Sequence, residues 1–214
     1  MKKNPDFSIL SPIYDFLGSL MFQGSLHSSQ TFFLDKLQEA KHVLILGGGT
    51  GRFLVDLLKR VKVEKVSYVD ISPGMIKQAK RKVQRLGIDD QVEFICGGLE
   101  LIPDDKFDLI CTHYFLDCFS DDELIGVYEL LKEKLSENGV WHFTDFYLDQ
   151  ESSSFRKAQV RFLYFFFRMS CGLKVDKLAN FKSLFEESGF KEREQKFFRR
   201  KLFRSALYEA YGSR

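Results

Sequence analysis

The chain has 214 residues, a length that suits one domain with a sizeable core. Its 32 basic residues nearly balance 30 acidic ones, which excludes a strong overall field toward nucleic acid or an anionic membrane. The four cysteines form no CxxC pair and no metal-ligand spacing, so we predict no metal site. Cys96 and Cys111 lie in apolar strand-like runs, so we predict buried free thiols there and a reducing, cytoplasmic compartment.

We expect no signal peptide and no integral membrane segment. The opening residues MKKNPDFS lead into polar positions instead of the apolar core of a signal peptide. The longest uninterrupted apolar run is FLYFFF at 162–167, well short of the roughly 20 residues that span a bilayer.

Residues 1–40 are expected to be helical. The segment FSILSPIYDFLGSLMF has clustered apolar positions that are interrupted by Pro12. The segment TFFLDKLQEA (31–40) has the amphipathic pattern of a helix.

From residue 41 onward, apolar strand-like runs alternate with helical patterns. Strands are predicted at 42–46, 65–70, 91–97, 107–114 and 139–147, and helices at 51–60, 72–87 and 121–135. The helix at 72–87 has Ser72 as its N-cap, Pro73 in its first turn and Gly87 as its stop. Strands separated by helices imply a parallel sheet with right-handed crossovers.

The pattern changes after Tyr147. Residues 152–171 look helical and very aromatic, and 177–188 form a further helix that Gly189 closes. Two strand-like runs follow, KEREQKFF and KLFRSALYEAY, separated by the basic stretch at 199–201. We therefore predict an antiparallel hairpin at the edge of the sheet.

The most informative segment is VLILGGGTGRFL, residues 43–54. An apolar run breaks into glycines and continues as a helix, which is the junction where parallel α/β sheets bind nucleoside-bearing cofactors. Gly47, Gly49 and Gly51 permit positive φ and place no Cβ between the backbone and a ligand. The spacing is G-x-G-x-G without the full dinucleotide pattern, and no Gly-Lys-Ser/Thr of a phosphate-binding loop follows.

Asp70 ends the next apolar run, nineteen residues after Gly51. A carboxylate at this position can accept both hydroxyls of a ribose. The alternative is that the glycines only form a tight turn and that Asp70 caps the following helix. The spacing between the two features favours the cofactor interpretation.

In this order, the motifs resemble those of the class I S-adenosylmethionine-dependent methyltransferases. The family's four motifs correspond to VLILGGGTGRFL, to VDISPGMI with Asp70, to CGGLELIP (96–103) and to FDLICTHYFLDCF (107–119). The resemblance implies a Rossmann-like methyltransferase fold of the α/β class, which is a doubly wound, mostly parallel seven-stranded sheet with a C-terminal antiparallel hairpin.

The resemblance also implies one domain over 1–214 and a cofactor site. The domain is expected to comprise a helical N-terminal lid (1–40), a cofactor-binding core (41–150), a helical cover (151–189) and the terminal hairpin (190–214). The residues assigned to S-adenosylmethionine are Gly47, Gly49, Gly51, Asp70, Ile71, Met75, Gly98, Leu99 and Thr112. Met75 is expected against the adenine, with a core position as the alternative, and Thr112 is expected to contribute its backbone.

Two positions depart from the family pattern. Ile45 stands where many members carry an acidic residue that engages the methionine amine. Gly98 stands where many carry an aspartate near the adenine amine. Both changes remove a polar contact, so a cofactor-binding protein without catalysis stays an alternative to an enzyme.

Methyl transfer from a sulfonium is an in-line displacement whose leaving group belongs to the cofactor. The protein therefore mainly aligns the nucleophile and excludes water. The ionisable residues placed best follow the fourth strand, where His113 is a candidate base near neutral pH and packing is its alternative. Tyr14 is a candidate lid residue that approaches the cofactor, also with packing as the alternative. Asp145, near the end of the fifth strand, is a weaker candidate for contact with the substrate.

The acceptor is indicated only by the aromatic stretch RFLYFFFRM (161–169). A helix that is hydrophobic nearly all round is buried or faces something apolar, so this one is core and dimer contact or a lid over the acceptor. We therefore predict a methyltransferase for a small, apolar or aromatic acceptor, with no nucleic-acid partner and with a homodimer left open. A nicotinamide-dependent oxidoreductase and an aminopropyl-transferring relative are the enzyme alternatives.

Overall fold

The computed structural model describes residues 24–37, 40–148, 152–154, 156–158, 160 and 178–210. The predictions for Tyr14 and for the aromatic stretch at 161–169 lie outside these described residues.

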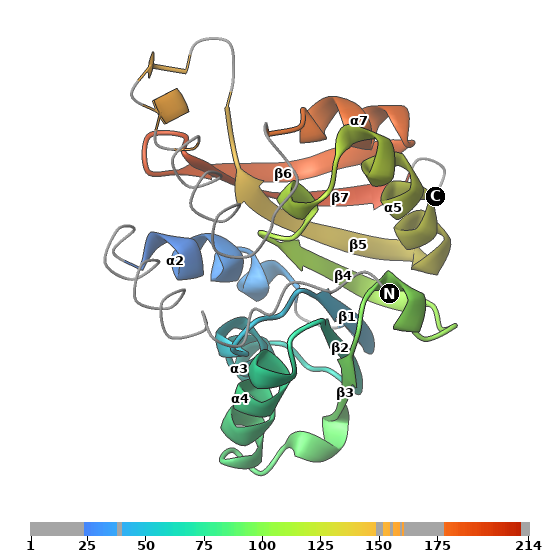
Figure 1. The fold of residues 1–214 in the computed structure, drawn as a ribbon. Helices are drawn as coiled ribbons and strands as arrows, with labels where there is room; N and C mark the ends of the chain where they lie inside the picture. Colours follow the sequence, from blue (N-terminus) through green and yellow to red (C-terminus); the bar gives the residue numbers. More distant parts are fainter. Residues whose placement is uncertain are drawn as a thin grey trace, which may run out of the picture.

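A seven-stranded sheet forms the centre of the molecule, in the order β3-β2-β1-β4-β5-β7-β6 (Figure 1). Its strands are β1 (His42–Leu46), β2 (Lys65–Asp70), β3 (Val92–Cys96), β4 (Phe107–His113), β5 (Leu135–Phe146), β6 (Phe190–Phe198) and β7 (Phe203–Ala210). The first five strands run parallel, whereas β7 is antiparallel to both β5 and β6. The predicted mostly parallel sheet with a terminal hairpin is confirmed.

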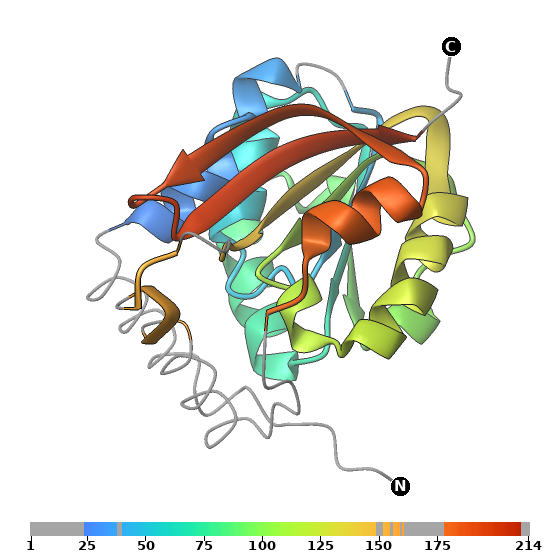
Figure 2. The same cartoon turned by 90° about the horizontal axis from the view of Figure 1, so that it is seen from above.

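Helices cover both faces of the sheet, as the view from above shows (Figure 2). One face carries α2 (Ser25–Thr31), α3 (Arg52–Arg60) and α4 (Pro73–Gln84), and the other carries α5 (Asp121–Lys134) and α7 (Phe181–Glu187). Short 3₁₀ turns are η1 (Leu34–Lys36), η2 (Asp89–Gln91), η3 (Leu99–Leu101) and η4 (Leu116–Cys118). Within the described part of the chain, no helix has both the length and the apolar character that a membrane span requires.

The alternation of side chains along β1 divides the core into two layers. Val43 and Ile45 pack with Leu57 and the rest of the α2–α3–α4 side. Leu44 and Leu46 point to the opposite face and join the cluster of α5 and α7. A strand buried on both faces is typical of the centre of a parallel sheet, which explains the uninterrupted apolar run VLIL at 43–46.

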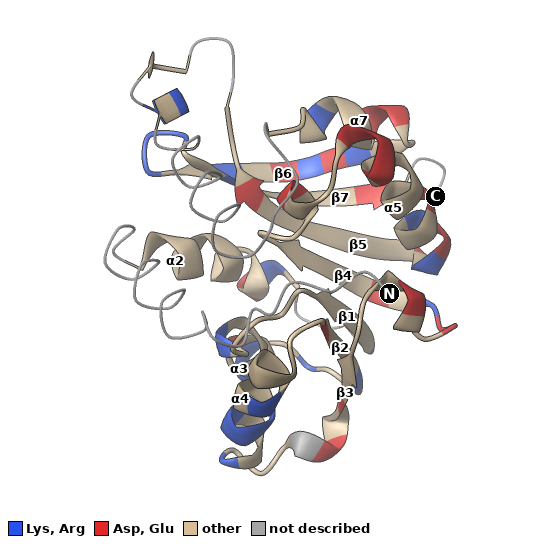
Figure 3. Cartoon of the chain, in the orientation of Figure 1, with Lys and Arg blue, Asp and Glu red and all other residues tan. Residues whose placement is uncertain are grey.

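The helix ends follow the signals in the sequence. Ser72 accepts a hydrogen bond from the backbone N–H of Met75 at 3.4 Å, and Gly87 has a φ of 67°, as a helix stop requires. Ser120 and Glu123 form a capping box at the start of α5. Acidic residues gather at this end of α5, whereas α4 carries only basic charges (Figure 3).

Several element boundaries differ from prediction, and two of these differences are informative. The amphipathic segment at 31–40 is not one helix, because α2 ends at Thr31 and η1 follows. Phe33, Leu34 and Leu37 are all buried, and this packing overrides the helical pattern. Strand β5 begins at Leu135, directly after α5, and its pairing with β4 shifts register after Phe107.

Candidate functional site

The loops that follow β1, β2, β3 and β4 meet at the carboxyl edge of the sheet. The backbone N–H of Gly47 donates to the carbonyl of Val69 at 2.9 Å. The N–H of Gly97 donates to the carbonyl of Asp70 at 3.1 Å. The first three sequence motifs are thus joined by backbone hydrogen bonds, at the edge where open α/β sheets bind ligands.

The glycine loop adopts the backbone conformation predicted for it. Gly47, Gly49 and Gly51 have φ values of 61°, 64° and 79°. A Cβ added to Gly51 would lie 2.7 Å from the Cβ of Ala79, so this glycine allows α3 to approach α4. A Cβ added to Gly49 would meet nothing within 4 Å, so Gly49 borders open space.

The carboxylate of Asp70 is held between two loops. Its Oδ2 accepts the backbone N–H of Gly49 at 2.8 Å, and its Oδ1 accepts the N–H of Ser72 at 2.8 Å. Burial raises the pKa of Asp70, whereas the N–H bonds from Ser72 and Gly49 act to lower it. Asp70 therefore helps to shape the loop, but it does not cap the following helix, because the N-cap of α4 is Ser72. Each oxygen keeps a lone pair for a further donor.

Tyr68 packs against the glycine loop. This residue was not identified from the sequence. Its hydroxyl donates to the carbonyl of Gly49 at 2.9 Å. Its ring would lie 2.2 Å from a Cβ at Gly48, so Gly48 must be glycine because of Tyr68. Burial raises the pKa of Tyr68 well above its ordinary value, which keeps the hydroxyl a donor.

The remaining predicted cofactor residues lie around the same edge. Ile71 is half-buried beside Asp70, and Met75 is buried in the first turn of α4. The N–H of Gly98 donates to Oε1 of Glu100 at 3.1 Å, and Leu99 begins η3. These residues are brought together as the motif order predicts.

The side chain of Thr112 is engaged in the core, and a contribution of its backbone to the cofactor site stays a prediction. Its side chain is fully buried, and its Oγ1 accepts the indole N–H of Trp141 at 2.8 Å. Trp141 belongs to the core on the α5–α7 side of the sheet. The hydroxyl of Thr112 thus satisfies a buried donor and is directed away from the glycine loop.

His113 lies in the core below the loop. Its Nε2 lies 3.3 Å from Nδ1 of His142, and its ring centroid lies 4.3 Å from that of Phe53 in an edge-on contact. Burial, and secondarily His142, lowers the pKa of His113 well below its ordinary value. A neutral, buried imidazole favours the packing interpretation, and a catalytic role for His113 stays a prediction.

Asp145 is fully buried and holds the loop after β4. Its Oδ1 accepts the N–H of Phe146 at 2.8 Å, and its Oδ2 accepts the N–H of Asp117 at 3.3 Å. Burial, followed by the charge of Asp117, raises the pKa of Asp145 well above its ordinary value. These bonds engage both carboxylate oxygens with the protein's own backbone.

Aromatic side chains surround the carboxyl ends of β4 and β5. Tyr114 has a left-handed φ of 53°, which is unusual for a bulky residue and is characteristic of functional sites. Its hydroxyl lies 2.7 Å from Oγ of Ser29 in α2, and its ring lies 5.4 Å from Phe146 and 5.8 Å from Phe203. The pairing of Tyr114 with Ser29 joins residues 85 apart, and no local sequence signal predicts it.

Ile45, which stands where many family members carry an acidic residue, lies in the apolar core. Ile45 is 2% exposed and packs with the α2–α3–α4 cluster. The structure thus offers no acidic side chain at that position.

Known proteins were compared with the chain. A family model described as a methyltransferase domain matches residues 43–139. Ubiquinone/menaquinone biosynthesis C-methyltransferase UbiE of Klebsiella pneumoniae subsp. pneumoniae is 29% identical over 133 residues, which are 59% of this chain and 53% of the relative. The chain therefore spans about half the length of the curated relatives it matches.

Solved structures share the fold. The structure titled a DhpI–SAH complex has a TM-score of 0.67 and 18% identity, covering 95% of this chain and 93% of the other. An O-methyltransferase from neocarzinostatin biosynthesis, NcsB1, was solved with S-adenosylmethionine and 2-hydroxy-5-methyl naphthoic acid. It has a TM-score of 0.68 and 17% identity, covering 95% of this chain and 58% of the other.

The order of the motifs, the order of the strands and the similarity to known methyltransferases favour a methyltransferase over the alternative of a nicotinamide-dependent oxidoreductase. The glycine loop, the carboxylate at the end of β2 and the antiparallel β7 occur together in this chain, and solved structures of this fold include complexes with SAH and with S-adenosylmethionine. The chain matches a methyltransferase-domain model over residues 43–139 and has the Rossmann-like fold of the class I S-adenosylmethionine-dependent methyltransferases.

Proposed function

We propose that the protein transfers a methyl group from S-adenosylmethionine to a small, apolar or aromatic acceptor. The observation that carries the proposal is the position of Asp70. Its carboxylate lies 2.8 Å from the N–H of Gly49, the loop glycine that borders open space. Asp70 would accept the ribose hydroxyls, and the backbone of Gly47 and Gly49 would let the cofactor lie against the loop.

The donor set fits this cofactor. A nucleoside needs a carboxylate for its ribose and a surface free of Cβ atoms, and both occur at the junction of β1 and β2. Met75 and Leu99 would contact the adenine, and the backbone of Gly98 and Thr112 would line the site. When bound, S-adenosylmethionine supplies an electrophilic methyl group with its own leaving group.

The protein's own part is to exclude water and to align the acceptor. Tyr114, Phe146 and Phe203 form an apolar wall at the carboxyl ends of β4 and β5 and the amino end of the antiparallel β7. Phe115 and Phe119 form a second ring pair, with centroids 5.1 Å apart, in the loop after β4. Such walls suit a ring-bearing acceptor. NcsB1, which has this fold, was solved with a naphthoic acid, and the relative UbiE is named for quinone biosynthesis.

A test is transfer of tritiated methyl groups from S-adenosylmethionine to a panel of hydrophobic phenols, quinones and fatty acids. We expect labelled product with a ring-bearing acceptor and none with the fatty acids. Labelling of the fatty acids alone would contradict the acceptor class.

A second candidate is a cofactor-binding protein without turnover. It rests on Ile45, an apolar core residue where the family's acidic contact would be, and on the Gly98 N–H, which Glu100 already occupies. Saturable cofactor binding without labelling of any acceptor would favour this candidate.

A further inference from the structure

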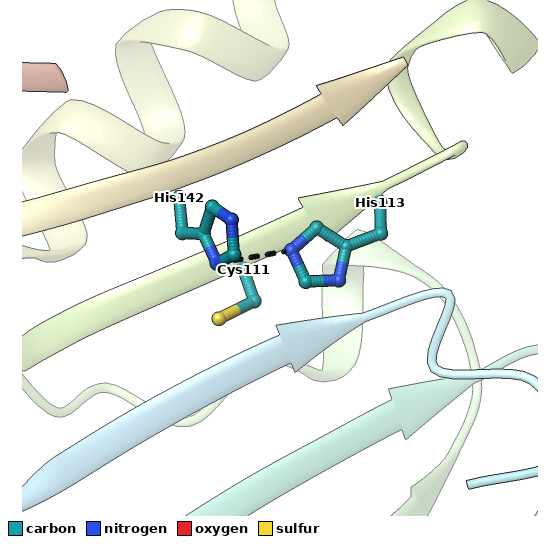
Figure 4. Close-up of side chains that lie close together, drawn as sticks. All are labelled: Cys111, His113 and His142. Atoms are coloured by element: carbon teal, nitrogen blue, oxygen red, sulfur yellow. Dashed lines mark hydrogen bonds between the residues drawn. The ribbon is translucent and has the colours of Figure 1, made fainter. Parts of the chain in front are cut away.

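Three side chains that can bind a metal meet on one face of the sheet. Cys111 and His113 are two residues apart on β4, so their side chains lie on the same face of the sheet. His142 lies on the neighbouring strand β5, directly opposite Cys111. Figure 4 shows the three side chains on the same side of these strands, with the two imidazoles joined by a hydrogen bond. One potential ligand atom from each residue lies within 4.8 Å of the other two.

The spacing of these atoms suits a single ion. Three atoms that are at most 4.8 Å apart have a common point about 2.8 Å or less from each, and metal bonds of 2.0–2.3 Å require shifts of only about half an ångström to an ångström. The two imidazole nitrogens are 3.3 Å apart. Two nitrogens bound to one tetrahedral ion at about 2.05 Å would be separated by about the same distance.

The surroundings of His142 prepare its nitrogen for such an ion. Its Nε2 lies 3.2 Å from Oγ of Ser205, and that oxygen also accepts the hydroxyl of Thr144 at 2.9 Å. With Nε2–H donating to Ser205, the lone pair of Nδ1 faces His113. A histidine that binds a metal ordinarily donates its other ring nitrogen to a fixed partner in this way.

Charge and burial indicate which ion the group would take. Cys111 and His142 are fully buried and His113 is 7% exposed. Among the residues that the structure describes, no carboxylate belongs to this group. A thiolate with two neutral imidazoles carries one negative charge, so a monovalent ion leaves the buried site neutral, whereas a divalent ion leaves a positive charge. Thiolate and imidazole ligands favour copper(I) and zinc(II).

We propose that Cys111, His113 and His142 bind one thiophilic metal ion, with copper(I) preferred over zinc(II). The thiol proton of Cys111 leaves to solvent as the metal–sulfur bond forms, and no electron is transferred. The ion would join β4 to β5 directly below the glycine loop. This site uses none of the residues proposed to hold S-adenosylmethionine, but a bound ion would occupy the Nε2 of His113, the candidate base.

The test is a titration of the reduced, metal-free full-length protein under anaerobic conditions. Copper(I) is supplied from a chromophoric chelator and zinc(II) in a parallel series, and bound metal is counted by mass spectrometry after desalting. We expect one equivalent of copper(I), with zinc(II) bound more weakly. Cys111→Ser should lower the affinity by about 100-fold or more, whereas the exposed-thiol control Cys118→Ser should retain it.

Substitution of the buried residue Cys111 can also unfold the protein, so a second variant is needed that leaves all three ligands in place. Ser205→Ala leaves all three ligands in place and removes only the partner of His142. It should weaken metal binding by roughly 10-fold to 100-fold. Failure of the native protein to retain either metal would overturn the proposal, as would equal retention by Cys111→Ser. Tighter binding of zinc(II) than of copper(I) would overturn the charge argument.

Discussion

The amide nitrogen of Gly49 lies 2.8 Å from Oδ2 of Asp70, so the loop after β1 and the end of β2 are joined by one hydrogen bond. The other carboxylate oxygen accepts the N–H of Ser72 at the same distance. Asp70 therefore shapes the loop, and its remaining lone pairs are the ones that we propose accept the ribose hydroxyls.

Asp70→Asn should lower the affinity for S-adenosylhomocysteine by roughly 10-fold to 100-fold. Two charge-assisted hydrogen bonds to the ribose are weakened, each worth about 1 kcal/mol or more. The change is measured by calorimetric titration, with Asp105→Asn as the control because Asp105 pairs with Lys65 on the surface. Unchanged affinity in a folded Asp70→Asn variant would remove Asp70 from the site.

Gly51→Ala should destabilise the protein by roughly 2 kcal/mol or more. The new Cβ would lie 2.7 Å from that of Ala79, and φ at this position is 79°. Gly126→Ala is the matched control, because Gly126 lies within α5 and an added Cβ meets nothing within 4 Å. There the substitution should stabilise by about 0.5–1 kcal/mol. Urea unfolding of both variants tests this, and equal effects would contradict the packing described.

Thr112→Val should separate the two roles of this residue. The indole N–H of Trp141 loses its acceptor at 2.8 Å inside the core, which should cost about 1–3 kcal/mol of unfolding free energy. Cofactor affinity should stay unchanged, because only the backbone of Thr112 is expected at the site. A large loss of affinity at full stability would show instead that the hydroxyl contacts the cofactor.

The buried histidines should make the metal-free protein sensitive to acid. Burial lowers the pKa of His142 from 6.5 to about 3 and, together with His142, lowers that of His113. Because the folded-state pKa values lie below the unfolded ones, this stability is fully present above pH 6.5 and is lost as the pH falls toward the folded values. The slope approaches about 1.4 kcal/mol per pH unit for each histidine.

A comparison with His142→Gln isolates this effect. The buried Asp70 and Asp145 have raised pKa values and act in the opposite direction, but they are common to both proteins. The native protein should therefore lose stability more steeply than the variant between pH 6.5 and 4.5. Parallel pH profiles would contradict the burial of an unprotonated His142.

Local sequence signals predicted much of the fold. The bounds of β1 and β2, the N-cap at Ser72 and the positive φ of the loop glycines follow from patterns within a few residues. The antiparallel hairpin followed from two strand-like runs and the basic tip at 199–201, whose three residues all have positive φ.

Contacts that depend on the register between distant strands could not be predicted. Cys111 and His142 become neighbours only because β4 and β5 pair in one particular register. Ser29 reaches Tyr114 only because α2 packs beside the sheet. A spacing rule within one segment carries no information about either pairing.

The most direct test of the central claim is calorimetric titration of the purified protein with S-adenosylmethionine, S-adenosylhomocysteine and NAD in parallel. We predict saturable, one-to-one binding of both sulfur nucleosides and no heat of binding with NAD. Binding of NAD alone, or of none of the three, would contradict the proposed cofactor site at Gly49 and Asp70.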